Sequence, residues 1–212
     1  KKIMNLPKPI KFEVERYVGG LSQFKKIENP IKLSANESAL GASPRAIEVF
    51  EKEKNKVFKY PEDDSNSLRE LLSKKFEIDP KRIICGSGSD QIFDLTCRLF
   101  LNPGDEVIVT EFGFIMYKIY ASLNKAKVVL AKEKNFKASV EEIIKKVSNK
   151  TKIVFIANPN NPTGTYLSKK EMLDLRKKLR SDILLVVDDA YFEFVNSDNF
   201  SSGLDLFKDS AN

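Results

Sequence analysis

Three short polar clusters in this sequence each follow an apolar run, and each carries side chains that can bind a ligand. The clusters are GSGSDQ (residues 86–91), NPNNPTG (158–164) and DDAY (188–191). They supply backbone N–H groups, amides, carboxylates and a phenol at the ends of apolar segments. These groups can hold an anion, an oxygen atom or a cation.

The cluster at 86–91 has the composition of an anion site. Two glycines permit close backbone approach, and Ser89 stands where a helix N-cap is expected, so free N–H groups would face a phosphate. Position 91 is Gln where GxGxxG needs its third glycine, and no Gly-Lys-Ser/Thr follows. The cluster is therefore neither a dinucleotide fingerprint nor a P-loop. An ordinary strand-to-helix turn explains it equally well.

The cluster at 158–164 is a stiff corner. Pro162 fixes its own φ and keeps Asn161 out of the helical region, which holds the Asn161 amide in one direction. A single Asn-Pro unit usually forms a local Asx turn. Two such units in succession are more rigid than a connection needs, which favours a ligand contact from Asn161.

Asp188 ends the apolar run at 183–187. A carboxylate at the mouth of a buried strand is unfavourable unless a cation or strong donors meet it, so a metal, a sugar hydroxyl or a protonated heterocyclic nitrogen is a candidate partner. Strand alternation directs Asp189 to the opposite face, as a helix cap or surface group. Tyr191 can return to the edge where Asp188 lies. The alternative is a capping aspartate and a core tyrosine.

The elements that must position these clusters alternate along the chain. Helical periodicity and S-x-x-E capping boxes predict helices that begin at Ser67, Ser139 and Ser168. Two more helices are expected, one after GSGSD with Ile92, Leu95, Leu99 and Phe100 on its apolar face, and one over 114–123. Apolar runs predict strands at 82–84, 106–109, 127–130, 152–156 and 183–187.

Strands that are apolar throughout are covered on both faces. Alternation of such strands with helices predicts an α/β fold, a three-layer sandwich around a largely parallel sheet. In open sheets of this kind, ligands bind beyond the carboxyl ends of the strands. The three clusters then share one edge with Phe114, which follows the strand at 106–109. Core packing is the simpler explanation of Phe114 taken alone.

Composition narrows the class of protein. The chain has 212 residues, 42% of them hydrophobic, and its net charge of +6 comes from lysines spread among acidic residues. A nucleic-acid surface would gather its charge on one element, so we expect no nucleic-acid partner. Two cysteines and no histidine argue against a zinc site, and we expect no metal. No segment has the length of a membrane span, so we expect a soluble, cytoplasmic protein.

Six segments resemble, in order, the motifs of the fold-type I pyridoxal-phosphate aminotransferases. They are KLSANESALGASP (32–44), YPEDDSNSLRELL (60–72), GSGSDQIFDL (86–95), GFIMY (113–117), ANPNNPTG (157–164) and VVDDAYFEF (186–194). The histidinol-phosphate aminotransferases are the subfamily that the chain resembles most. NPNNPTG and D-x-A-Y at this separation are the most specific motifs, and the N-terminal ones are less specific.

This resemblance implies a site for pyridoxal 5'-phosphate. Phe114 would stack on the pyridine ring, and Asn161 and Tyr191 would hydrogen-bond the phenolic oxygen of the ring. Asp188 would pair with the protonated ring nitrogen and keep its proton in place. Asp188, Tyr191 and Asn161 are thereby the catalytic residues that the resemblance implies within this chain.

The resemblance also implies which residues bind the phosphate group of the cofactor. Ser89, Asp90 and Gln91 would hold the cofactor phosphate at a helix N-terminus. Tyr60 would reach across a homodimer interface to the phosphate of the partner's cofactor.

The resemblance also implies a domain plan. Residues 1–35 would form an N-terminal arm that contributes to the small domain and to the dimer contact, with Tyr17 and Asn36 placed for substrate contacts. Residues 36–212 would form part of the large cofactor-binding domain, and the C-terminal small domain is absent from this sequence. The Schiff-base lysine, in a Ser/Thr-x-Ser-Lys motif, is expected beyond residue 212, because Lys208 in DLFKDS does not fit that motif. We expect the 212 residues alone to be inactive.

The implied reaction is a ping-pong transamination between histidinol phosphate and glutamate or 2-oxoglutarate, in histidine biosynthesis. An aromatic amino-acid aminotransferase and a phosphothreonine-type decarboxylase are alternatives within the family, because the specificity residues lie outside this stretch. A non-catalytic module that binds a phosphate ligand is the alternative outside it. A nucleotide-binding α/β enzyme would need a Rossmann or Walker loop, which the sequence lacks.

Overall fold

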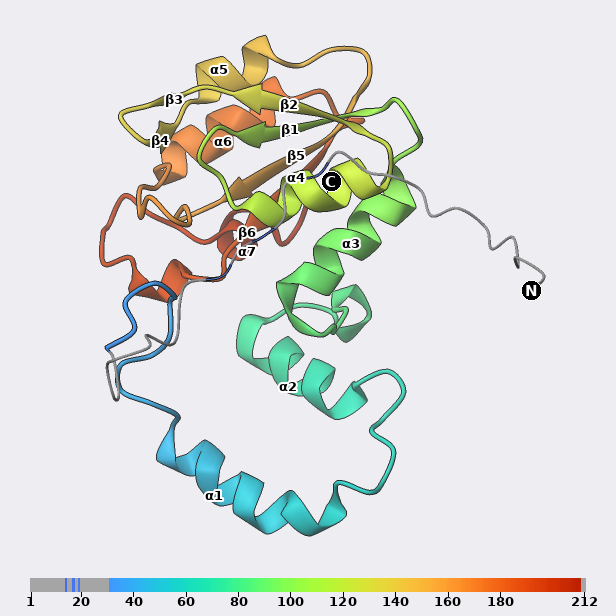
Figure 1. Cartoon of the computed structure of the whole chain (residues 1–212), viewed down its shortest axis with the longest axis vertical. Coiled ribbons are helices and arrows are strands. Elements are labelled where there is room, and N and C mark those ends of the chain that lie inside the picture. Colours follow the sequence, from blue (N-terminus) through green and yellow to red (C-terminus); the bar gives the residue numbers. More distant parts are fainter. Residues whose placement is uncertain (1–13, 15–16, 18, 20–30, 211–212) are drawn as a thin grey trace, which may run out of the picture. The chain divides into compact units, whose positions relative to one another are not determined.

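The structure, a computed structural model, describes residues 14, 17, 19 and 31–210. The chain divides into two compact units, one of residues 16–85 and one that includes residues 86–212. Figure 1 shows the helices and strands of both units. The domain plan with a boundary at residue 35 stays a prediction, and most of the expected N-terminal arm lies outside the described residues.

The unit of residues 16–85 is helical where it is described. It contains α1 (Pro44–Glu53), a 3-10 helix (Lys54–Lys56), α2 (Asn66–Phe76) and a second 3-10 helix (Pro80–Arg82). The capping box expected at Ser67 is wrong. The helix begins one residue earlier, so Ser67 lies in its first turn, and the Ser67 amide and hydroxyl donate to the Glu62 carboxylate at 3.0 and 2.8 Å.

The strand expected at 82–84 is also wrong. Ile83 has extended backbone angles, but no described strand pairs with this segment. Without a neighbour the N–H and C=O groups form no ladder. Ile84 is 74% exposed, so the segment also lacks the packing of a buried strand.

The unit of residues 86–212 contains a parallel sheet with helices before and after its strands. Its elements are α3 (Gly88–Phe100), β1 (Glu106–Thr110), α4 (Ile115–Leu123), β2 (Lys127–Ala131), β3 (Glu133–Lys134), β4 (Lys137–Ala138), α5 (Val140–Lys145), β5 (Thr151–Ala157), α6 (Lys169–Lys178), β6 (Leu184–Asp188), a 3-10 helix (Phe192–Phe194) and α7 (Gly203–Phe207). The four-stranded sheet has the order β2-β1-β5-β6, with every pair parallel. The strands expected at 106–109, 127–130, 152–156 and 183–187 are thereby confirmed to within a residue or two.

Two hydrophobic cores lie on the two faces of this sheet. On one face, Val107 and Phe155 pack with Phe93 of α3 and Tyr117 of α4. On the other face, the core joins β1 and β5 to α5 and α6, and its members include Ile108, Val154, Ile143, Met172 and Leu175. These layers are visible around the sheet in Figure 1 and confirm the three-layer α/β sandwich. Alternate residues of one strand supply opposite cores, as period-2 geometry requires.

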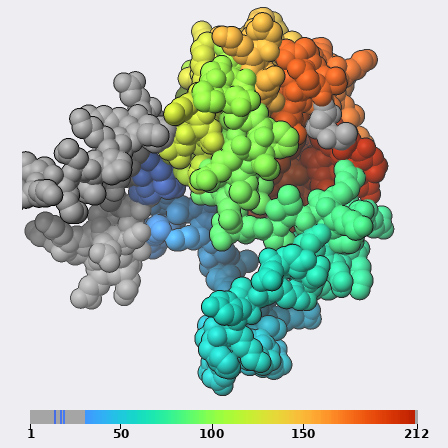
Figure 2. Space-filling view, turned by 90° about the vertical axis from the view of Figure 1, so that its right-hand side faces the viewer, coloured from blue at the N-terminus to red at the C-terminus, as the bar shows by residue number. Residues whose placement is uncertain are grey.

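The apolar face expected for α3 is wrong. Phe93 and Cys97 are the buried residues of this helix, whereas Leu95, Leu99 and Phe100 are 38%, 74% and 54% exposed. The expected stripe and the observed one both have helical spacing, so periodicity alone could not separate them. Figure 2 shows the outer surface of α3 in green.

The capping boxes at the two later helices have different outcomes. Ser168 caps α6 with both reciprocal bonds to Glu171, as predicted. Ser139 accepts the Glu142 amide N–H at the start of α5, which is one half of the motif. In the part of the chain that the structure describes, no helix is long and apolar enough to cross a membrane.

Candidate functional site

The ends of β5 and β6 bring two of the polar clusters together. Ala157 is the register partner of Asp188, and the Asn158 amide donates to the Asp188 carbonyl oxygen at 3.0 Å. The stiff corner that follows β5 therefore starts beside the carboxylate that ends β6. This adjacency confirms the prediction of a shared edge at the carboxyl ends of the strands.

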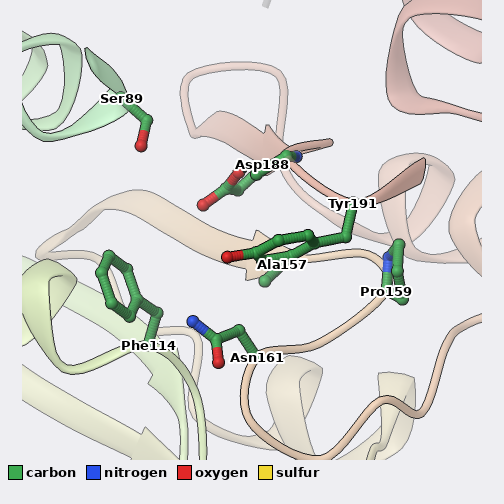
Figure 3. A pocket seen from close by; sticks show the side chains of 8 residues that line it. Ser89, Phe114, Ala157, Pro159, Asn161, Asp188 and Tyr191 are labelled. Atoms are coloured by element: carbon green, nitrogen blue, oxygen red, sulfur yellow. Dashed lines mark hydrogen bonds between the residues drawn. The ribbon is translucent and has the colours of Figure 1, made fainter. Parts of the chain in front are cut away.

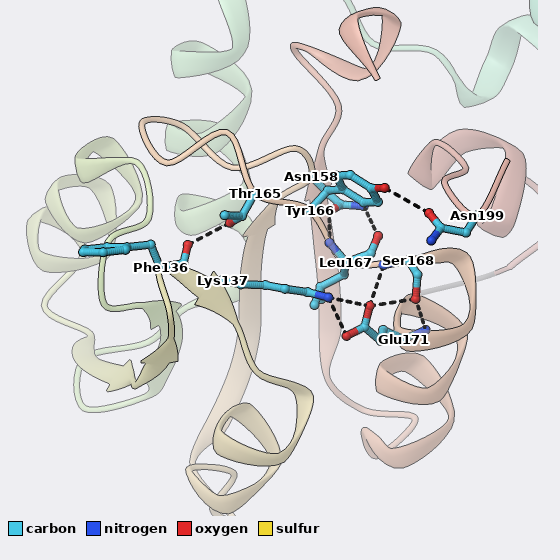
Figure 4. Close-up of polar contacts among 9 residues, drawn as sticks. All are labelled: Phe136, Lys137, Asn158, Thr165, Tyr166, Leu167, Ser168, Glu171 and Asn199. Atoms are coloured by element: carbon cyan, nitrogen blue, oxygen red, sulfur yellow. Dashed lines mark hydrogen bonds and ion pairs between the residues drawn. The ribbon is translucent and has the colours of Figure 1, made fainter. Parts of the chain in front are cut away.

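Asn158 holds the corner to the chain that leaves it. Its side chain is 1% exposed and pairs with the Leu167 backbone, accepting the N–H at 2.7 Å and donating to the C=O at 3.1 Å (Figure 4). A buried amide with both groups paired in this way stabilises the loop rather than binding a ligand.

Neighbouring elements hold the far end of this loop. The Thr165 hydroxyl donates to the Phe136 carbonyl oxygen at 2.7 Å, and Lys137 forms an ion pair with Glu171 at 2.8 Å (Figure 4). The same Glu171 carboxylate completes the capping box of α6 with Ser168. The corner is therefore anchored to the β3–β4 hairpin and to α6.

Asn160 closes the turn itself. Its backbone N–H donates to the Thr165 carbonyl oxygen, and its C=O accepts the Gly164 N–H, both at 2.8 Å. Its side-chain amide donates to the Thr163 hydroxyl at 2.9 Å and to the Phe112 carbonyl oxygen at 3.3 Å. Hydrogen bonds therefore hold both Asn158 and Asn160, which fixes the backbone that leads into Asn161. Both Asn-Pro bonds of the corner are cis.

Phe114 is carried by the turn that follows β1. The Gly113 N–H donates to the Thr110 carbonyl oxygen, and a Cβ at position 113 would lie 2.7 Å from the Thr110 hydroxyl oxygen. Only glycine fits such a close approach. The chain then enters α4 with Phe114 at the N-cap position, so the ring leaves the turn at the edge of the sheet.

One pocket at this edge gathers five of the residues singled out in the sequence. Ser89, Phe114, Asn161, Asp188 and Tyr191 line it. Ala157, Pro159 and Ala190 complete the lining. In Figure 3 the Asn161 amide and the Tyr191 hydroxyl are directed toward the space beside Phe114, with the Asp188 carboxylate on the far side of Tyr191. A carboxylate, an amide, a phenol and an aromatic ring therefore surround one cavity.

Asp188 receives two hydrogen bonds within the protein. The Ala190 backbone N–H donates to Oδ1 at 3.1 Å, and the Tyr117 hydroxyl donates to Oδ2 at 2.7 Å. Tyr117 lies within the motif GFIMY, yet sequence reasoning assigned it no role. The signal that was present is a buried-looking tyrosine three residues after Phe114 on the same predicted helix.

Asp189 points away from the pocket, as predicted for the helix-capping alternative. Its two oxygens accept the N–H groups of Gly203 and Leu204 at 3.0 and 3.1 Å, at the start of α7. Burial raises the pKa of Asp189 above its usual value, and the two amide bonds oppose that shift. Two adjacent aspartates therefore serve opposite sides of the sheet edge.

The residues of the cluster at 86–91 lie at different positions relative to the start of α3 and to the pocket. Ser87, and not Ser89, occupies the N-cap position of α3, so the N-cap expected at Ser89 is wrong and Ser89 lies in the first turn beside the pocket. The Gln91 side chain accepts the Ser87 N–H at 2.6 Å.

Asp90 has one buried carboxylate oxygen with no hydrogen-bond partner among the described residues. Burial raises the pKa of Asp90, and the Asp188 carboxylate raises it further. Neither Asp90 nor Gln91 lines the pocket.

The remaining candidates belong to the unit of residues 16–85. Tyr60 and Tyr17 are 99% and 55% exposed, and Asn36 is exposed as well. The sequence-derived roles of these three residues in substrate and partner contacts stay predictions.

Comparison with known proteins assigns the family. The sequence model of class I and II aminotransferases matches residues 28–212. The chain belongs to the class I and II aminotransferases. This aminotransferase chain is 57% identical to histidinol-phosphate aminotransferase of Pelagibacter ubique (strain HTCC1062) over 209 residues, which are 99% of the chain and 58% of that protein. It is 42% identical to the histidinol-phosphate aminotransferase of Rhodospirillum rubrum over all of its 212 residues, again 58% of that protein.

Solved structures agree on the fold. The histidinol-phosphate aminotransferase of Sinorhizobium meliloti, crystallised in complex with pyridoxal-5'-phosphate, superposes with a TM-score of 0.75 at 23% identity. The match covers 79% of the aminotransferase chain and 46% of that structure. The chain thus spans about 58% of the length of the curated relatives it matches and a smaller share of the solved structure.

Proposed function

We propose that the protein containing this chain is a histidinol-phosphate aminotransferase, which transfers an amino group between histidinol phosphate and 2-oxoglutarate or glutamate with pyridoxal 5'-phosphate, in histidine biosynthesis. The observation that carries the proposal is the 57% identity to an enzyme of that name over 99% of the chain. The pocket supports it independently, because the chain's most specific motifs meet there.

The residues of the pocket fit this cofactor. The basic nitrogen of the pyridine ring needs an anion, and Asp188 supplies it. The phenolic oxygen needs hydrogen-bond donors, and Asn161 and Tyr191 supply them. The phosphate needs an anion-binding helix end, and Ser89 lies in the first turn of α3.

Asp188 is the group that controls the ring nitrogen. When bound, pyridoxal phosphate acts as an electron sink for the carbanion that forms as the substrate Cα loses its proton. The Asp188 carboxylate favours the protonated, positively charged nitrogen by direct charge interaction. Its orientation is set by the two donors described above, Tyr117 and Ala190.

Three further residues orient the ring. Asn161 and Tyr191, which line the pocket, would donate to the phenolic oxygen and stabilise its anionic form, and Phe114 would cover one face of the ring. The braced corner at 158–164 restricts where the Asn161 amide can lie. A site held on rigid elements in this way needs no rearrangement to bind.

The phosphate lies, in this proposal, at the N-terminus of α3. The first-turn N–H groups of a helix have no partner within the helix, and the helix dipole favours an anion there. Ser89, Asp90 and Gln91 supply the N–H groups, with the Ser89 hydroxyl beside the pocket. Because the pKa of Asp90 is raised by burial, its carboxyl group resists ionisation next to a phosphate.

The proposal extends beyond the residues that line the pocket. Tyr60 reaches the partner's cofactor phosphate in a homodimer, and Tyr17 and Asn36 contact the substrate. The lysine that binds the cofactor covalently lies beyond residue 212, and the enzyme is cytoplasmic. The 212 residues alone are then expected not to transaminate.

The proposal is tested with the full-length protein. We expect pyridoxal phosphate to bind with one equivalent per chain by absorbance titration, and histidinol phosphate to be the amino donor with the highest kcat/KM. Phenylalanine and aspartate serve as the competing donors. A protein that binds no pyridoxal phosphate would refute the proposal, and one that prefers phenylalanine would keep the reaction and overturn the substrate.

A further inference from the structure

Tyr117 is a buried polar side chain next to a residue of the pocket. Its side chain is 1% exposed, and its hydroxyl donates to Asp188 Oδ2 at 2.7 Å. It does not line the cavity itself. Tyr117 therefore bonds to a residue that lines the pocket without lining the pocket itself.

Three aromatic rings hold Tyr117. Phe155 of β5 stacks on it with the ring centroids 5.0 Å apart and the planes 5° from parallel. Phe93 of α3 and Phe114 meet it edge-on, at 5.0 and 5.7 Å. Contacts from three separate segments leave the phenol ring one position, so its hydroxyl has a fixed place relative to the end of β6.

The protonation state of this pair is also restricted. Burial raises the pKa of Tyr117 far above its usual range, and the Asp188 carboxylate raises it further. The raised pKa keeps the phenol protonated at neutral pH, so the hydroxyl is the donor of the bond to Asp188. Asp90 on α3 is the other carboxylate that raises the pKa of Tyr117, and Asp189 follows Asp188 on the opposite side of the sheet edge.

We infer that Tyr117 is a positioning residue for Asp188: it fixes the orientation of the carboxylate, so that the charge stays in place at the pocket. A buried tyrosine needs a partner for its hydroxyl wherever it lies, and a backbone carbonyl would satisfy it. Here the partner is the one carboxylate that lines the cavity. A charged acceptor gives a bond roughly twice as strong as a neutral one. The inference rests on the proposed function for the ligand that Asp188 meets.

The test uses Tyr117→Phe in the full-length protein, with Tyr120→Phe as the matched control on the same helix. Tyr120 is a partly buried neighbour of the same core, and its hydroxyl makes no hydrogen bond to the residues that the structure describes. In protein freed of cofactor, the Asp188 carboxyl signal is followed by carbon-13 NMR, with Asp188→Asn to assign it. We expect Tyr117→Phe to move the chemical shift of the Asp188 carboxyl carbon, because the hydrogen bond to Oδ2 is lost, and Tyr120→Phe to leave that signal unchanged.

The second readout separates positioning from packing. Tyr117→Phe is expected to weaken pyridoxal-phosphate binding about tenfold in the wild-type background, and less than about twofold in the Asp188→Asn background. A purely structural role would weaken binding equally in both. Equal losses in the two backgrounds, or an unchanged Asp188 carboxyl signal, would overturn the inference.

Two outcomes keep the inference separate from the proposed function. If the wild-type protein binds no pyridoxal phosphate, the proposed function fails, while the Asp188 carboxyl signal in Tyr117→Phe still decides the inference. If Tyr117→Phe does not fold, 3-fluorotyrosine at position 117 keeps the ring and the hydroxyl but makes it a stronger donor. We then expect the Asp188 carboxyl signal to move, and an unchanged signal would contradict the inference.

Discussion

Two sides of the same sheet edge use similar residues for opposite purposes. On the pocket side, Asn161 and Asp188 face the cavity. On the packing side, which faces α6 and α7, Asn158 and Asp189 bond to backbone groups of Leu167, Gly203 and Leu204. The two asparagines come from the motif NPNNPTG, and the two aspartates come from the motif DDAY.

The two sides differ in whether the side-chain hydrogen-bonding groups are paired within the protein. Asn158 has both of its amide groups paired within the loop, whereas the Asn161 side chain makes no hydrogen bond to the residues that the structure describes. Groups on the packing side are therefore expected to control stability, and groups on the pocket side to control binding. A motif match alone does not separate the two, because both members belong to it.

The strongest test of this division is Asp188→Ala beside Asp189→Ala. In the full-length protein, Asp188→Ala should lower kcat for transamination by at least about 100-fold, because the charge that stabilises the ring nitrogen is removed. Asp189→Ala should lower stability and leave kcat per folded molecule within about twofold. Steady-state kinetics with a folded-fraction measurement by circular dichroism checks both. Comparable losses of kcat in the two variants would break the division.

The corner allows the same test with asparagines. Asn158→Ala leaves a buried N–H and C=O of Leu167 unpaired and should lower the free energy of unfolding by about 2–3 kcal/mol, read from urea denaturation. Asn161→Ala should change stability by less than about 0.5 kcal/mol and weaken pyridoxal-phosphate binding about tenfold. If Asn161→Ala destabilises as much as Asn158→Ala, the corner is a structural turn and no ligand contact is needed to explain it.

Asp189 also predicts a pH dependence. Burial holds its pKa in the folded protein above the usual 3.8, so the folded state keeps a proton that the unfolded state releases. Stability from this group is therefore present below pH 3.8 and is lost as the pH rises through the raised pKa. Asp189→Asn should remove this part of the slope of unfolding free energy against pH, and an identical slope in wild type and variant would contradict the assignment.

The smallest effect is expected at the cap of α6. Ser168→Ala removes the reciprocal bonds with Glu171 and should lower the free energy of unfolding by about 1 kcal/mol. Ser168→Thr keeps a capping hydroxyl and serves as the control. Neither variant should alter cofactor affinity, and an altered affinity would show that the two sides of the edge are coupled.

The sequence predicted what depends on local pattern. The apolar runs located the strands of the sheet, and S-x-x-E located the start of α6, because in each case neighbouring residues decide the outcome. The motif residues that meet in the pocket were also found, because topology brings the carboxyl ends of parallel strands to one edge.

What the sequence missed depends on distant residues. The strand expected at 82–84 has no described neighbour to pair with, and the face of α3 that is buried was chosen by Tyr117 and Phe155, far along the chain. The same holds for the bond from Tyr117 to Asp188, which joins residues 71 positions apart. Ser67 failed for a local reason, since Glu62 takes both of its donors.

The strand order β2-β1-β5-β6 also indicates when the pocket forms during folding. β1 pairs with β5, which starts 45 residues later at Thr151 against Glu106, and the corner meets Asp188 only after β6 has joined β5. Pairings this distant in sequence are slow, because the chain must close long loops before it gains any contact. The pocket therefore assembles late in folding, after the local helices, and a nascent chain becomes able to hold a ligand only once residues as far as Tyr191 are in place.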